Sequence, residues 1–271
     1  MNDPTSASPW ALVTGASAGI GAAFARELAR RGYSLVLVAR RRDRLEALAR
    51  ELESGLGVRT LVVECDLARA ESVAELHART EAAGIAVEML VNNAGYGVTG
   101  HLQAQPWERH RDFIGVLMSA PVELCWRYLP AMQARGRGHI VNVASLAGLM
   151  PGSAGHTLYA ASKSFLSKFS QSLALENSPR GVNVTALCPG FTYSEFHDVT
   201  GARAIVSKMP RMMWMHADAV AADGVEAVLR GDVVRIPGAV NRVIAWFGKH
   251  LPDQLGLLLM KRQSRRFRVQ D

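Results

Sequence analysis

Long apolar runs are absent from these 271 residues. The longest, such as Leu35 to Val38 and Leu257 to Met260, fall far short of the roughly 18 residues that a membrane-spanning helix needs. The first ten residues carry one aspartate, two prolines and no basic residue, which is not the pattern of a secretory signal. We therefore expect a protein that stays in the cytoplasm.

Cysteine is scarce as well. The three cysteines, Cys65, Cys125 and Cys188, are odd in number and widely spaced. This excludes a disulfide framework, and the spacing does not match that of a metal site. The sequence therefore predicts reduced, mostly buried thiols and no bound metal.

Positive charge is in excess, but only near the end of the chain. The net charge is +7, and residues 242–271 carry seven Lys or Arg against two Asp. Nothing else in the sequence favours a nucleic-acid partner, so we expect none. The same extension holds apolar stretches at Val243–Phe247 and Leu255–Met260. We favour a helical extension that packs on its own lid or on a neighbouring subunit, with peripheral contact to an anionic membrane as the alternative. Pro252 argues against one long amphipathic helix.

Half of the chain is apolar, and its apolar residues follow an alternating pattern. Short β-branched runs alternate with amphipathic segments, which predicts a single α/β domain with a doubly wound parallel sheet between two layers of helices. The expected strands are Ala11–Val13, Leu35–Val38, Thr60–Val63, Met89–Val91, His139–Val143 and Val182–Leu187. The expected helices are Ala22–Arg31, Arg42–Glu53, Glu71–Ala83, Pro106–Gln133 and Tyr159–Glu176.

A glycine-rich turn follows the first expected strand and leads into a helix. Glycines allow a tight turn there and let backbone N–H groups approach a pyrophosphate at the positive end of the helix. The spacing is GxxxGxG, and a simple strand-to-helix turn would look similar. The position in a βαβ unit favours a dinucleotide site formed by Gly15, Ser17, Gly19, Ile20 and Gly21.

The second strand ends in arginines, where a site selective for NAD would carry an acidic residue. Arg40 and Arg41 offer planar guanidinium groups that suit a 2′-phosphate, and the Ser17 hydroxyl is expected to help. At least one of Arg41 and Arg42 is expected to begin a solvated helix instead. We predict NADP(H) as the cofactor.

Two further strand ends carry polar side chains. Asp66 follows the third strand, where it either accepts a hydrogen bond from an adenine amino group or caps the next helix. Asn92 and Asn93 end the fourth strand, before Ala94 and Gly95. Their amides are expected to tie neighbouring strands together or to border the cofactor, and both roles remain open.

A tyrosine and a lysine one helical turn apart provide the candidate chemistry. Tyr159 and Lys163 lie on the same face of a helix, where an ammonium group is expected to lower the pKa of the phenol. Ser145 closes the fifth strand and is expected to bind the same substrate oxygen. Ser145 and Tyr159 would polarise a carbonyl, and Tyr159 would deliver the proton that accompanies hydride transfer.

Together these motifs make the stretch from Thr14 to about Thr192 similar to the short-chain dehydrogenase/reductase family. The matching elements are the TGxxxGxG loop, the NNAG strand end, the serine, the YxxxK pair and the CPGFT sequence that begins at Cys188. The resemblance implies a Rossmann-type fold and a homodimer or homotetramer. It also implies that Pro189, Gly190 and Thr192 hold the nicotinamide end.

One position departs from the family pattern. Leu117 stands where many members carry an asparagine that helps a relay water reach the lysine. A leucine side chain makes no hydrogen bond, so the relay is either rerouted, slowed or lost. The sequence still favours an active enzyme, and the alternative is a cofactor-binding scaffold or sensor with little activity.

The family resemblance places a substrate lid at about residues 191–216. Four methionines and a tryptophan lie within Met209–Met215, which indicates either an adaptable apolar surface or ordinary helix packing. With a lid of this composition, the substrate is expected to be a hydrophobic ketone or secondary alcohol. His156 is expected to be a local structural or pocket residue and not a second acid. The candidate pocket residues are Tyr96, Leu149, Met150, Tyr193 and Phe196.

Overall fold

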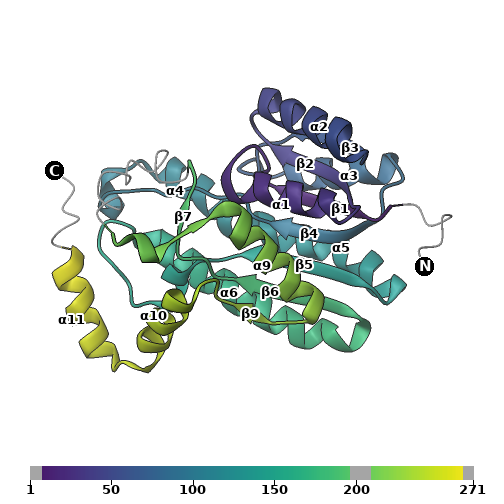
Figure 1. Ribbon diagram of the computed structural model, residues 1–271. Helices are drawn as coiled ribbons and strands as arrows, with labels where there is room; N and C mark the ends of the chain where they lie inside the picture. The colour runs from purple at the N-terminus through teal and green to yellow at the C-terminus, as the bar shows by residue number, and fades with distance from the viewer. Residues whose placement is uncertain (1–7, 196–208, 265–271) are drawn as a thin grey trace.

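Seven parallel strands form the centre of the molecule in the computed structural model, which describes residues 8–195 and 209–264 (Figure 1). Their order across the sheet is β3-β2-β1-β4-β5-β6-β9. The expected doubly wound, Rossmann-type single domain is therefore confirmed. The strands are β1 (Trp10–Thr14), β2 (Ser34–Ala39), β3 (Thr60–Glu64), β4 (Val87–Asn92), β5 (Gly138–Val143), β6 (Val182–Leu187) and β9 (Val234–Arg235).

Helices cover both faces of this sheet. On one face lie α1 (Gly19–Arg30), α2 (Arg42–Leu56) and α9 (Ala217–Arg230). The other face carries α3 (Ser72–Ala82), α5 (Ala120–Arg135) and α6 (Thr157–Asn177). A helix α4 (Trp107–Ile114) runs into α5 through a π-helical stretch, Gly115–Ser119. The sequence predicted these helices to within a few residues, but it did not predict α9 or β9.

Alternation along the strands divides the apolar core into two layers. Ala11 and Val13 of β1 pack with α1, α2 and α9, whereas Leu12 between them packs against the opposite helices. All three side chains are fully buried. Because successive side chains of a strand point to opposite faces, a continuous apolar run is what a strand covered on both faces requires.

The strand order reverses between β1 and β4, and buried amides join the strands beside that point. The Asn92 Nδ2 of β4 donates to Asn142 Oδ1 of β5 at 2.8 Å, and Asn142 Nδ2 donates to Ser170 Oγ of α6 at 2.8 Å. This answers one of the open questions for Asn92, whose amide ties neighbouring strands. Ligands of such sheets bind at the carboxyl ends beside the reversal, and all the candidate motifs lie at that edge.

The C-terminal extension forms two helices, α10 (Ala239–His250) and α11 (Asp253–Ser264), with Pro252 between them as expected. Both pack on the loop that follows β5. A Cβ on Gly248 would lie 2.5 Å from Met150 Sδ, and one on Gly256 would lie 2.8 Å from Pro151 Cγ. The sequence did not predict the loop after β5 as the packing partner, but α10 also contacts the expected lid, where Asn241 Nδ2 lies 3.7 Å from Met215 Sδ.

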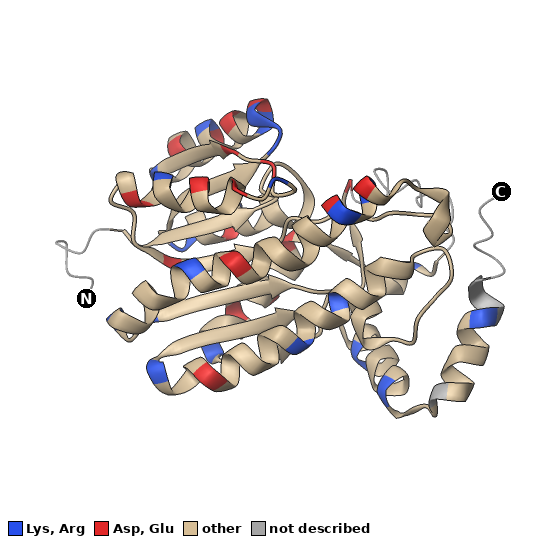
Figure 2. Cartoon of the chain, turned by 180° about the vertical axis from the view of Figure 1, so that it is seen from behind, with Lys and Arg blue, Asp and Glu red and all other residues tan. Residues whose placement is uncertain are grey.

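The outer surface of this extension is apolar and basic. In Figure 2 the residues of α10 and α11 whose side chains are described include Lys and Arg, in blue, and no acidic residue. Among residues 8–195 and 209–264, no helix is both long enough and apolar enough to cross a membrane. Exposed apolar side chains on these two helices include Val243, Trp246, Phe247, Leu255, Leu257, Leu258 and Leu259.

Replacing the central amide of the buried network tests its contribution to the fold. We expect Asn142→Ala to lower the free energy of unfolding by about 2–4 kcal/mol, because it removes two buried hydrogen bonds and leaves a small void. Denaturant unfolding measures the change. Leu175→Ala, at a side chain that is 77% exposed, serves as the control and should stay within about 0.5 kcal/mol of the wild type. Equal effects of the two substitutions would contradict this role of Asn142.

Candidate active site

The glycine-rich loop between β1 and α1 has the geometry of a dinucleotide cradle. Gly15 and Gly19 adopt φ values of +68° and +55°, which favour glycine. A Cβ on Gly21 would collide with the Gly15 carbonyl and approach Asn93 Nδ2 to 2.5 Å. The loop therefore turns tightly and presents the N-terminus of α1 at the sheet edge, an arrangement suited to a pyrophosphate. Ile20 packs beneath it on the core.

Thr14 and Asn93 hold this loop against β4. The Asn93 Nδ2 donates to Thr14 O at 2.9 Å, and the Thr14 hydroxyl donates to Val91 O at 3.2 Å. The same hydroxyl accepts from the backbone N–H groups of Asn93 and Ala94 at 2.9 and 3.0 Å. The side chain of Asn93 is thus engaged in joining β4 to the loop after β1. Gly95 follows, where a Cβ would lie 3.8 Å from Lys163 Nζ.

Arginines from the end of β2 surround Ser17. Arg41 donates to Ser17 Oγ from Nε at 3.2 Å and from Nη2 at 3.0 Å, which joins two residues that the sequence assigned to one phosphate. Arg40 is exposed at the strand end. Arg42 pairs with Glu46 on the surface of α2, and it is the arginine that begins a solvated helix. These groups fit a 2′-phosphate in charge and hydrogen-bonding geometry.

Asp66 caps a turn and not a helix. Its Oδ1 accepts from Ala68 N at 3.1 Å, while α3 starts only at Ser72. The prediction of a helix N-cap is therefore wrong, because a turn over residues 67–71 separates Asp66 from α3. Its place after β3 at the cofactor edge of the sheet is as expected.

Ser145, just beyond the end of β5, comes together with Tyr159 and Lys163 from the first turns of α6. Ser145 accepts from Ala147 N at 3.1 Å and hydrogen-bonds to Tyr159. Lys163 Nζ donates to Val143 O at 2.8 Å and lies 5.9 Å from the centre of the Tyr159 ring. The three groups can therefore act on one substrate oxygen, with the phenol between the serine and the lysine.

The pKa of Tyr159 corrects one expectation. Burial raises it above the ordinary tyrosine value, and the hydrogen bond from Ser145 only partly offsets that effect. Lys163 was expected to lower this pKa, but its own ammonium is buried and bonded to the Val143 carbonyl. The phenol consequently keeps its proton at neutral pH, which is the form that donates to a carbonyl oxygen.

Burial also lowers the pKa of Lys163, to about 8. Leu117 contributes to its apolar surroundings, since a Cβ on Gly95 would contact both Leu117 Cγ, at 3.6 Å, and Lys163 Nζ. Leu117 is fully buried in the π-helical stretch between α4 and α5. A π turn interrupts the regular ladder of helical hydrogen bonds and is frequent at functional sites.

The turn after β6 lies beside the serine. Leu146 N donates to Pro189 O at 2.9 Å, and Thr192 Oγ1 donates to Gly190 O at 3.2 Å. A Cβ on Gly190 would collide with the amide of Asn241 from α10. Pro189, Gly190 and Thr192 therefore border the chemical groups, at the place where the resemblance puts the nicotinamide.

Apolar side chains approach this centre from three segments. Tyr96 packs edge-on against Phe113 with ring centres 5.6 Å apart, and Leu149 and Met150 lie on the loop after Ser145. Tyr193 stacks on Trp214 at 4.7 Å, where β7 (Phe191–Tyr193) pairs with β8 (Trp214–His216). These two strands form the base of the expected lid. Phe196 lies outside the described residues.

His156 precedes α6 directly, and burial lowers its pKa. Its backbone forms a bridge with Gly100, which agrees with a structural role. No group of three or more His, Cys, Asp or Glu suited to a metal ion occurs in the ranges 8–195 and 209–264.

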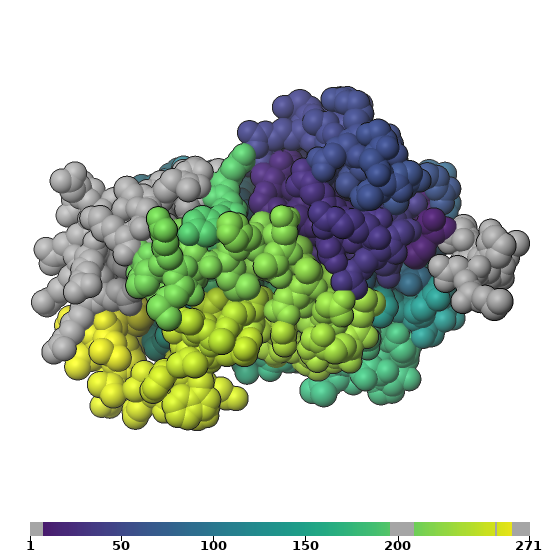
Figure 3. Space-filling model, in the orientation of Figure 1, coloured from purple at the N-terminus to yellow at the C-terminus, as the bar shows by residue number. Residues whose placement is uncertain are grey.

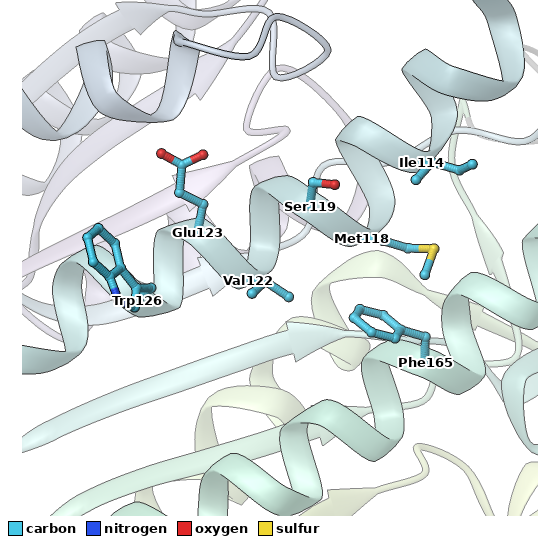
Figure 4. Close-up of a pocket in the computed structure, with 7 residues that line it drawn as sticks. All are labelled: Ile114, Met118, Ser119, Val122, Glu123, Trp126 and Phe165. Carbon is cyan, nitrogen blue, oxygen red and sulfur yellow. The ribbon is translucent and has the colours of Figure 1, made fainter.

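A hollow of about 530 Å³ is lined by side chains of α4, the π-helical stretch, α5 and α6 (Figure 4). Trp126 is 70% exposed at its edge, and Phe165 points into it from the face of α6 opposite the buried Lys163. This surface does not belong to the candidate site. Its lining residues are Ile114, Met118, Ser119, Val122, Glu123, Trp126 and Phe165.

Comparison with known proteins agrees with this geometry. The short chain dehydrogenase family model matches residues 9–203. The chain belongs to the short-chain dehydrogenase/reductase family. It is accordingly an oxidoreductase that acts on alcohol or carbonyl groups with a nicotinamide cofactor.

Several relatives and solved structures resemble this member of the family. An uncharacterized oxidoreductase of Myxococcus xanthus (strain DK1622) is 40% identical over 222 residues, which cover 82% of this chain and 84% of that protein. The 17-beta-hydroxysteroid dehydrogenase type 3 of Danio rerio is 33% identical over 68% of this chain, and the match spans 61% of its own length.

Two solved structures align over nearly the whole chain. The short-chain dehydrogenase from Sphingobium yanoikuyae in complex with NADPH has a TM-score of 0.78 at 32% identity and covers 97% of both chains. The bulky-bulky ketone specific alcohol dehydrogenase from Comamonas testosteroni has a TM-score of 0.74 at 30% identity and covers 97% of this chain and 95% of the other.

Sequence reasoning missed three polar residues that the fold brings to this edge. Arg44 lies one helical turn after Arg41, and that spacing was a usable signal. Glu195 contacts both arginines, and Asn241 contacts the Gly190 turn. Both come from distant parts of the chain, so no local pattern could have indicated them.

The buried ammonium of Lys163 should make stability depend on pH. With a folded pKa of about 8 against about 10.5 when unfolded, Lys163 binds fewer protons in the folded state between these values, so stability rises with pH across that window. We expect Lys163→Met to raise the free energy of unfolding by about 1–2 kcal/mol at pH 7, and the gain to shrink towards pH 10.

Denaturant unfolding at several pH values measures this difference. Lys168→Met, at an exposed position of the same helix, is the matched control and should show no such trend. If the stability difference between Lys163→Met and the wild type does not change with pH, the interpretation that burial lowers the pKa of Lys163 is wrong.

Proposed function

We propose that this protein is an NADP(H)-dependent oxidoreductase that transfers a hydride between the nicotinamide and a hydrophobic ketone or secondary alcohol. The observation that carries the chemistry is the convergence of Ser145, Tyr159 and Lys163, with the Ser145 hydroxyl bonded to Tyr159. The observation that favours NADP(H) is the bond between Arg41 and Ser17 beside the glycine loop.

Each group has a defined task in the reduction. The substrate oxygen would accept hydrogen bonds from the hydroxyls of Ser145 and Tyr159, which stabilises the negative charge that develops on it. A nicotinamide cofactor, when bound, would supply the hydride for the carbonyl carbon. Tyr159 then gives its proton to the oxygen, so that a ketone becomes a secondary alcohol, and the reverse sequence oxidises the alcohol.

Lys163 supports this transfer from behind. Its ammonium, held at Val143 O, is placed to stabilise the phenolate that Tyr159 becomes after proton donation. Its lowered pKa also lets it pass a proton towards Tyr159 near pH 8. Leu117 offers no side-chain hydrogen bond, so a relay in this protein would run past the backbone of the π-helical stretch.

A bulky apolar substrate is favoured by the surroundings of the site. Tyr96, Met150 and Tyr193 supply aromatic and sulfur surface, and α10 and α11 pack directly on the loop that bears Met150 and Pro151. The relatives named for a bulky-bulky ketone and for a hydroxysteroid support the same substrate class.

Loss of the phenol hydroxyl tests the chemistry. We expect Tyr159→Phe to lower NADPH-dependent reduction of hydrophobic ketones by about 10²–10⁴-fold, because the proton donor is gone, while NADPH still binds. Turnover is measured by NADPH absorbance and binding by fluorescence titration. Tyr33→Phe, at a tyrosine between α1 and β2, is the control and should keep full activity. If wild type and Tyr159→Phe bind NADPH and are equally inert, the scaffold alternative holds.

Cofactor choice has its own test. Arg40→Ala combined with Arg41→Ala should weaken NADPH binding by about 10–100-fold through the loss of charge-assisted hydrogen bonds, with NADH affected by less than about threefold. Titration of both cofactors gives the two dissociation constants. Arg42→Ala removes one positive charge from the neighbouring surface pair with Glu46 and should change neither. Equal losses for both cofactors would refute the 2′-phosphate assignment.

A further inference from the structure

The two residues after β7 lie across the glycine-rich loop. A Cβ on Gly19 would come within 3.0 Å of Ser194 Cβ, so the chain there leaves space only for a glycine. The pairing of Thr192 with Met215 and of Tyr193 with His216 fixes where this segment leaves β7. In Figure 3 the green end of this segment rests against the purple surface that contains the loop.

Glu195 places its carboxylate among the arginines that we assign to the 2′-phosphate. Its Oε2 accepts from Arg41 Nη1 at 2.9 Å, and both of its oxygens accept from Arg44 Nη1, at 2.6 and 2.8 Å. The two guanidinium groups lower the pKa of Glu195, so the carboxylate is ionised at neutral pH. The Glu195 carboxylate therefore lies beside the proposed 2′-phosphate site, although Glu195 follows β7 and is far from Arg41 and Arg44 in the sequence.

The hydrogen-bond donors of Arg41 are shared between these partners. Nε and Nη2 bond to Ser17, and Nη1 bonds to Glu195. Ser17 and Arg44 also line a hollow of about 210 Å³ between α1 and α2, so there is space beside them. A phosphate bound to Arg41 and Ser17 would bring two like charges together, unless the carboxylate gives way. A ribose 2′-hydroxyl has no such conflict and can donate to the carboxylate.

Resting on the cofactor assignment above, we propose that Glu195 is a specificity-determining residue that competes with the 2′-phosphate for Arg41 and Arg44. Its carboxylate weakens the binding of NADP(H) and leaves that of NAD(H) unchanged or slightly stronger. The protein consequently prefers NADP(H) by a narrower margin than its arginines alone would give. Because the Glu195 pairs are close to half exposed, the effect is a moderate one.

Neutralising this carboxylate tests the proposal. We expect Glu195→Gln to tighten the binding of NADPH and of 2′,5′-ADP about fivefold, and to leave NADH and 5′-AMP unchanged or weaker. Titration calorimetry with the two adenosine phosphates reads the 2′-phosphate alone, independently of turnover. Glu46→Gln is the matched control, since it removes the same charge from a glutamate of similar exposure, 42% against 45% for Glu195, that pairs with Arg42 on α2.

Selective tightening of the 2′-phosphate ligands by Glu195→Gln, and not by Glu46→Gln, supports the competition. Equal changes for 2′,5′-ADP and 5′-AMP, no change, or weaker NADPH binding would overturn it. Arg41→Ala separates this inference from the cofactor assignment. If Arg41→Ala selectively weakens 2′,5′-ADP while Glu195→Gln has no selective effect, the inference on Glu195 fails alone. If Arg41→Ala also affects both ligands equally, the assignment of the phosphate fails with it.

Discussion

The hydroxyl of Thr14 joins the two halves of the sheet at the point where the strand order reverses. It donates to β4 and accepts from the two backbone N–H groups that follow β4, while the Asn93 amide returns to the Thr14 carbonyl. Small residues at Gly15 and Gly21 leave room for these bonds. The cradle after β1 and the NNAG strand end are thus a single structure, and the helix N-terminus that faces the sheet edge depends on it.

Burial sets the chemistry on the other side of that edge. Lys163 is buried and Tyr159 is partly buried, and this desolvation raises the pKa of the phenol and lowers that of the lysine. Val143 O receives the ammonium, so the charge stays at a fixed place behind the phenol. Carbonyl reduction needs a proton donor, which the Tyr159 phenol can provide. It also needs a positive charge near the phenolate that remains, and the Lys163 ammonium can provide that charge.

Charge at the adenosine end follows a different rule, because these groups are exposed. Arg41, Arg44 and Glu195 form ion pairs that water and salt weaken, so they adjust affinity by small factors. Exposed pairs of this kind suit a choice between two cofactors that differ by one phosphate. Tyr159 and Lys163, in contrast, are more shielded from water, which suits a reaction that depends on the protonation state of both groups.

Local pattern was sufficient wherever a function lies within a few residues. The strand runs, the glycine spacing, Ser145 and the Tyr159–Lys163 turn follow from sequence because period and spacing determine which side chains share a face. Pro252 likewise marked the break between α10 and α11. By contrast, α9 and the two-residue strand β9 escaped prediction, since their apolar residues are recognisable as core only beside α1 and β6.

The tertiary structure determines which distant segments contact each other and which side chains lose their contact with water. The raised pKa of Tyr159 results from burial by several elements, so the sequence, which placed a lysine nearby, predicted the opposite direction. Glu195 reaches Arg41 across 154 positions of the chain, and Gly248 brings α10 onto the loop beside Ser145. The sequence by itself determined the fold, and it indicated the candidate catalytic groups and the edge of the sheet where we propose that the cofactor binds. Folding decided their protonation and their neighbours, because desolvation and long-range packing exist only in the assembled molecule.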